Sequence, residues 1–71
     1  MVNLDLLKTT IGDSGITMVA LARKTGIKRP TLINRLDGVG EFSASEIMGM
    51  CEALHINKQE RERIFFAKEV E

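Results

Sequence analysis

The sequence predicts an all-α fold, a compact five-helix bundle, and three observations support this prediction. Apolar residues recur at spacings of three and four in successive segments, which is the period of one helix face. Residues that cap helices begin these segments, and glycines or short polar stretches end them. The connections between segments are short, so the 71 residues (1–71) are expected to form a single domain.

The first predicted helix begins after Asn3, whose side chain can accept a hydrogen bond from an amide of the first turn. Leu4, Leu7 and Ile11 follow at spacings of three and four, so they form an apolar stripe. The breaker cluster GDSG at residues 12–15 is expected to end this helix near residue 10 or 11.

Two short helices joined by a tight turn are predicted next, between Thr17 and Gly38. Thr17 is a suitable N-cap because its hydroxyl can accept from a free amide. Leu21 and Ala22 lie on the inner face, and Ala22 is small where the two helices must cross closely. Gly26 ends the first helix at a position that needs a positive φ, which glycine adopts without a Cβ penalty. Gly38 closes the second helix.

The second helix of this pair carries Leu32 and Leu36 one turn apart on one face. Pro30 fits only the first turn, and it disfavours helical angles at Arg29. Either Lys28 or Arg29 is therefore the cap, and the sequence leaves both alternatives open.

The fourth predicted helix begins with a capping box, in which the Ser43 hydroxyl accepts from one amide and Glu46 reaches back to another. The apolar face of this helix consists of Ile47, Met50, Cys51 and Leu54. Residues 55–56 form the turn that follows it.

The last predicted helix repeats the capping pattern at Asn57 and runs to about Lys68. Its inner face includes Ile64 and one or both of Phe65 and Phe66. The sequence does not decide which phenylalanine is exposed.

The formal net charge is zero, although a dedicated DNA-binding domain gains much of its affinity from neutralising phosphates. The charges are unevenly distributed. Residues 1–40 contain six basic and three acidic residues, whereas residues 41–71 contain four basic and seven acidic residues. The N-terminal part of the chain is therefore net basic and the C-terminal part net acidic.

A cytoplasmic protein is expected. The single cysteine excludes an internal disulfide framework, which suits a reducing compartment. No apolar run approaches the ~20 residues that span a bilayer, so no membrane association is expected. Residues 1–4 lack the basic region that precedes the apolar core of a signal peptide.

An enzyme is not expected, because Cys51 and His55 are the only nucleophile–base pair that the chain offers. Cys51 lies on an apolar helix face and His55 at the helix end, so we interpret them as a buried small side chain and a terminal residue. Metal binding would need more ligands than the chain has, and no glycine-rich phosphate loop is present. No catalytic residue, metal or cofactor is predicted.

The helix that begins near Arg29 carries groups that can bind base edges or phosphates. Basic charge gathers at its start, where the helix dipole is already positive, so a negatively charged ligand is favoured there. Four apolar residues are expected to form an exposed patch beside these bases, which suits a protein interface better than a phosphate backbone. They are Met18, Val19, Pro30 and Ile33. The alternative is that the first or fourth helix half-buries Val19 and Ile33.

The Leu21–Ala22 pair, Gly26 and the TL-x-x-x-L-x-G pattern at residues 31–38 resemble the Cro/repressor type of helix-turn-helix protein. The EF pair at residues 41–42, the SEI run at 45–47 and the IFFA run at 64–67 resemble the small Cro-like proteins of Gram-positive temperate phages. The resemblance covers nearly the whole chain. Proteins of this type often have glutamine after the threonine cap, where this chain has methionine.

The resemblance implies a regulator of the lysis–lysogeny switch in a bacterial host cell, an antirepressor or modulator of repression. Its partner would be the helix-turn-helix domain at the N-terminus of the phage lysogeny repressor, whose operator binding it alters or blocks. The expected partner-binding residues are Met18, Val19, Lys28, Arg29, Pro30, Ile33 and Arg35.

A Cro-like repressor that binds operator DNA directly is the alternative. Arginine suits guanine and asparagine suits adenine in the major groove. The DNA-binding residues would then be Thr17, Lys28, Arg29, Thr31, Asn34 and Arg35. A homodimer on a palindromic operator fits this alternative, and the sequence leaves the oligomeric state open.

Overall fold

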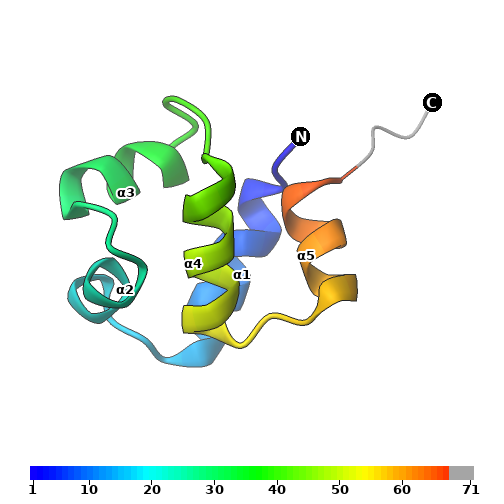
Figure 1. Cartoon of the computed structure of the whole chain (residues 1–71), viewed down its shortest axis with the longest axis horizontal. Helices are drawn as coiled ribbons and strands as arrows, with labels where there is room; N and C mark the ends of the chain where they lie inside the picture. The colour runs from blue at the N-terminus through cyan, green and yellow to red at the C-terminus, as the bar shows by residue number, and fades with distance from the viewer. Residues whose placement is uncertain (68–71) are drawn as a thin grey trace.

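The computed structural model describes residues 1–67 and contains five α-helices, with no strand in that part of the chain. The all-α prediction is therefore confirmed. Within the same residues no helix is long and apolar enough to cross a bilayer. The helices are α1 (Leu4–Ser14), α2 (Met18–Thr25), α3 (Arg29–Leu36), α4 (Ala44–Leu54) and α5 (Lys58–Phe65) (Figure 1).

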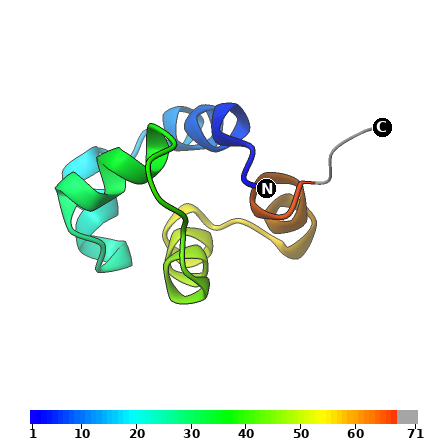
Figure 2. The ribbon, with the colours of Figure 1, turned by 90° about the horizontal axis from the view of Figure 1, so that it is seen from above.

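The helices are arranged along the long axis of the molecule. In Figure 2, α2 and α3 lie at one end and α5 at the other, with α1 and α4 between them. The principal-axis extents are 37, 23 and 20 Å. Surfaces on α3 and on α5 are therefore well separated.

Two predicted helix ends were wrong. α1 continues to Ser14, because Gly15, with φ of 73°, is the first residue to leave helical angles, whereas Gly12 stays within the helix. A single glycine inside a helix lowers stability without ending it. α5 ends at Phe65, with Phe66 as its C-cap. The predicted end at Lys68 lies outside the described residues.

Four of the five helices begin with the predicted side-chain caps. Asn3 and Thr17 each accept a hydrogen bond from an amide of their helix, and Ser43 and Asn57 both form complete capping boxes. The N-cap of α3 is Lys28, which settles the open alternative, and its side chain makes no capping bond.

The core is built from all five helices and from the turn after α2. Its buried members are Leu7, Ile11, Leu21, Ile27, Leu32, Leu36, Met50, Leu54, Ile64 and Phe65. Phe65 packs edge-to-face on Phe42, with ring centroids 5.7 Å apart. Phe66 is the exposed phenylalanine, with 49% of its surface accessible.

A close approach of α2 to α4 depends on Gly49. A Cβ at this position would lie 3.2 Å from the carbonyl oxygen of Thr25. The tight crossing that the sequence predicted at Ala22 is a different one, between α2 and α3, and Ala22 is half-buried against the core. The glycine on α4 therefore allows α2 and α4 to pack backbone against backbone.

Candidate functional site

The α2–α3 end of the molecule is held in place by the turn between its two helices. Gly26 ends α2 in the left-handed region, with φ of 74°, and its amide donates to the carbonyl of Ala22. The Thr25 hydroxyl donates to the Leu21 carbonyl at 2.8 Å and accepts from the Ile27 amide at 3.3 Å. Because Ile27 is buried, the turn is anchored in the core and α3 starts from a fixed position.

The outward face of α3 carries apolar side chains. Pro30 and Ile33 are exposed one turn apart, and Ile33 keeps 42% of its surface accessible. On α2, Val19 keeps 50% of its surface accessible. Val19 and Ile33 are therefore exposed, with about half of the surface of each side chain accessible. We call Val19, Pro30 and Ile33 the α2–α3 patch.

Met18 does not belong to this patch, contrary to the prediction. It is half-buried and packs against the core. Met18, Leu21, Ala22 and Thr25 follow the i, i+3, i+4, i+7 spacing of one helix face, and this face turns inward. The position directly after the Thr17 cap therefore lies on the inner side of α2.

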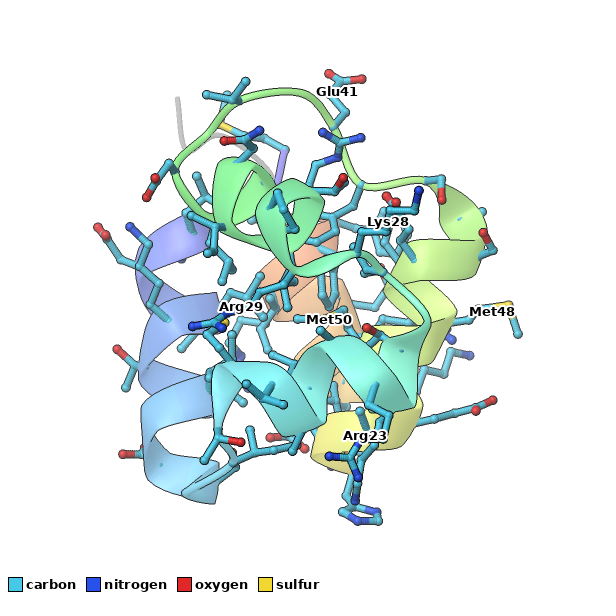
Figure 3. All side chains as sticks on the ribbon, turned by 90° about the vertical axis from the view of Figure 1, so that its left-hand side faces the viewer. Arg23, Lys28, Arg29, Glu41, Met48 and Met50 are labelled. Carbon is cyan, nitrogen blue, oxygen red and sulfur yellow. The ribbon has the colours of Figure 1, made fainter. Side chains whose placement is uncertain are left out.

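Exposed basic side chains lie on the same two helices and the turn between them, and Figure 3 shows Arg23, Lys28 and Arg29 at this end of the molecule. Together with Lys24, they have no carboxylate within ion-pair distance among residues 1–67. Lys28 and Arg29 also stand at the start of α3, where no side chain caps the free amides. This end of the molecule is therefore cationic and lacks internal compensation.

Arg35 is engaged within the molecule rather than projecting from it. Its Nη1 donates to the Val39 carbonyl at 3.3 Å, and its Nε lies 3.8 Å from Glu46 Oε1. The same Glu46 oxygen accepts from the Ser43 amide at 2.8 Å. Arg35 thus joins the end of α3 to the cap of α4, and we call this arrangement the Arg35 clamp.

Gly40 makes room for the Arg35 clamp. It has φ of 76°, and a Cβ there would collide with Arg35 Nη1. Arg35 was predicted to contact both a partner and DNA. Its side chain is 25% exposed and its guanidinium is held near Val39 and Glu46, so it is less accessible than Lys28 and Arg29.

The remaining candidates for DNA contact differ in accessibility. Asn34 is exposed on the outer face of α3, whereas Thr31 is half-buried. Thr17 is exposed, and its hydroxyl accepts from the Ala20 amide at 3.1 Å in capping α2, which leaves its O–H free to donate. Among the predicted DNA-binding residues, Thr17, Lys28, Arg29 and Asn34 are therefore the accessible ones.

Cys51 and His55 lie where the sequence indicated. Cys51 is half-buried against the core, and this burial raises the pKa of its thiol above the ordinary value, an effect that the Arg61 guanidinium partly opposes. His55 is the C-cap of α4, with φ of 55°. In residues 1–67 no group of three or more potential ligands could hold a metal ion.

Comparison with known proteins gives no assignment. No protein-family model, curated protein or solved structure matches the chain. Function must therefore be inferred from the surface just described, an apolar patch on α2 and α3 with unpaired cations beside it.

Proposed function

We propose that this chain is an antirepressor, a modulator of repression that acts in the cytoplasm of a phage-infected bacterium. It binds the helix-turn-helix domain of the lysogeny repressor and alters or blocks the repressor's operator binding. In this proposal α2 and α3 form a helix-turn-helix, with α3 as its outward helix. One observation carries the proposal: Val19, Pro30 and Ile33 are exposed at the end where such a protein would meet DNA.

An aliphatic side chain on the outward face of α3 suits a protein partner. Ile33 lies between Pro30 and Asn34 on that face, where a groove-binding helix needs donors and acceptors for base edges. The core of a protein interface is by contrast enriched in apolar and depleted in charged side chains. Burying three such residues on a partner supplies the desolvated centre that gives most of an interface's affinity.

The surrounding cations select the kind of partner. Arg23, Lys24, Lys28 and Arg29 would meet acidic groups next to an apolar area of the repressor domain. If this area overlaps the operator-contacting surface, the antirepressor and the operator exclude each other. Blocking then requires only that the lifetime of the antirepressor–repressor complex exceeds the time between the repressor's encounters with its operators.

Direct operator binding by a Cro-like repressor is the second candidate. It is favoured by the uncapped start of α3, where free amides and the side chains of Lys28 and Arg29 could bind a phosphate. Asn34 is exposed on the same helix and could pair with adenine. Binding of this kind would fall steeply with salt, because phosphate contacts release counterions.

Titration calorimetry in solution tests the proposal, with the repressor's N-terminal helix-turn-helix domain as the titrant. We expect a complex with micromolar or tighter affinity, and we expect Val19→Asp to weaken it. Gel shifts of operator DNA at two salt concentrations serve as the parallel measurement. Absence of a complex, together with tight and salt-sensitive binding of operator by this chain alone, would contradict the proposal in favour of the second candidate.

A further inference from the structure

A second apolar surface lies between α4 and α5, away from the α2–α3 patch. It is a groove of about 660 Å³, and its lining includes Phe42, Ile47, Met48, Arg61, Glu62 and Phe66. We call it the α4–α5 groove. Met48 keeps 61% of its surface accessible and Phe66 keeps 49%, so two large apolar side chains stand at its edge. We propose that this groove binds a second copy of the chain and forms a twofold-symmetric dimer.

Phe66 is the centre of the exposed apolar surface. It borders the α4–α5 groove and also the neighbouring hollow, which is lined in part by Met1 and Val2. Phe66 follows the last residue of α5, and its neighbour Phe65 fills the core. An aromatic side chain in this position contributes large contact area at low entropic cost when a partner covers it.

The charges of the groove indicate what covers it. Arg61 Nε is buried and has no hydrogen-bond acceptor in the described part of the chain. Neither Arg61 nor Glu62 takes part in an ion pair within residues 1–67. An arginine without an ion pair can form charge-assisted hydrogen bonds through its exposed nitrogens, so an incoming carboxylate is favoured beside the Arg61 guanidinium.

A second copy supplies that carboxylate by symmetry. In a twofold interface each contact occurs twice, so Arg61 of one copy would face Glu62 of the other, and the reverse. The groove offers one cation and one anion side by side, which makes it complementary to itself. The net charge of zero also means that two copies do not repel each other as whole molecules.

The size of the molecule is compatible with such a dimer. A standard interface covers roughly 800 Å² per partner, about a sixth of the accessible surface of 4982 Å². In Figure 2, α2 and α3 lie at one end of the long axis, α5 at the other and α4 between them, so a second copy bound over α5 would leave the outward face of α3 free. The dimer would therefore present two repressor-binding ends and engage two repressor domains with avidity.

Analytical ultracentrifugation of the full chain from low micromolar to millimolar concentration tests the dimer. The wild type should pass from monomer to dimer in this range. Arg61→Glu and Glu62→Arg should each raise the dimer dissociation constant by about tenfold or more, because each places like charges in contact. Circular dichroism checks that both variants remain helical.

The decisive arm mixes the two charge variants. An Arg61→Glu chain and a Glu62→Arg chain are complementary at both contacts, so their mixture should form a heterodimer where each alone stays monomeric. Phe66→Asp should abolish the dimer, and Val19→Asp on the other surface should leave it intact. A wild type that stays monomeric at millimolar concentration overturns the proposal, as does a mixture that forms no heterodimer. Loss of repressor binding in Phe66→Asp, with a monomeric wild type, would assign the groove to the repressor instead.

Discussion

The two exposed apolar surfaces of this molecule differ in the charges beside them. The α2–α3 patch carries Val19 and Ile33 and has only unpaired cations nearby. The α4–α5 groove carries Met48 and Phe66 and has one cation and one anion. Both surfaces are apolar at the centre, so the two proposals differ through the charges: a surface of one sign suits an acidic partner, and a surface of mixed sign suits itself.

Substitution by aspartate at the centre of each surface should have the largest effect on binding, and it distinguishes the partner of one surface from the partner of the other. Ile33→Asp is expected to weaken repressor binding by about 30-fold or more, because it puts a charge into the desolvated centre of the interface. Phe66→Asp should leave the repressor affinity of the monomer unchanged. Calorimetry at concentrations below the dimer range measures both. If Phe66→Asp weakens repressor binding and Ile33→Asp does not, the assignment of partners to surfaces is wrong.

Two glycine-to-alanine variants test whether the Arg35 clamp holds α3 in position. Gly40→Ala should destabilise the fold by about 1–2 kcal/mol, because alanine is strained at positive φ and displaces Arg35 from its contacts. Gly12→Ala should stabilise it by about 0.5–1 kcal/mol, because nothing lies near its Cβ and alanine favours helix. Thermal and denaturant unfolding compare them. Gly26→Ala is the matched control for strain, because Gly26 has a similar φ of 74° with nothing within 4 Å of its Cβ. An equal loss in Gly26→Ala and Gly40→Ala would show that the clamp contributes nothing.

Removing a cation from the α2–α3 end, and in a control from α5, tests whether the location of charge affects the rate of association with the repressor. Lys28→Ala is expected to lower the association rate with the repressor by about threefold at low salt, and less at high salt. Arg63→Ala removes an exposed cation of α5 and serves as the matched control. Stopped-flow mixing at two ionic strengths measures the rates. Equal losses in both variants would mean that net charge, rather than its location, governs the encounter.

The smallest expected effect concerns Cys51, which lies between the two surfaces on α4. Burial raises the pKa of its thiol above the ordinary value of 9.0, so folding favours the protonated form. This contribution to stability is present below pH 9.0 and is lost as the pH rises through the folded-state pKa. Unfolding of the wild type and of Cys51→Ala across alkaline pH measures it. A steeper alkaline loss in the alanine variant would contradict the expectation.

The local features of the fold were predictable from the sequence. Ser43 and Glu46 lie within one helical turn of each other, so their capping box is encoded by adjacent residues. The same holds for the Thr17 cap and for Gly26 at the end of α2. Ile33 was also predicted to face outward, because helix period alone places it off the Leu32 side.

Features that depend on distant residues were not predictable. Arg35 was expected to contact a partner, and only the course of residues 37–43 shows that its guanidinium is engaged. Gly49 gave no signal in the sequence, because its role depends on where α2 crosses α4. The α4–α5 groove was missed for the same reason. Its residues come from two helices and the loop before them, and no periodic pattern connects these.

The start of the chain runs along the end of α5, and this affects how the protein can be tethered. The Asn3 amide donates to the Ile64 carbonyl at 2.6 Å, and the Met1 amino group donates to the Ala67 carbonyl at 3.4 Å. A surface or fusion partner attached at residue 1 would sit beside Phe66, which borders the same hollow as Met1. Such a sample would keep the proposed repressor-binding end open while masking the proposed dimer surface, so tests of the two proposals call for attachment at different points.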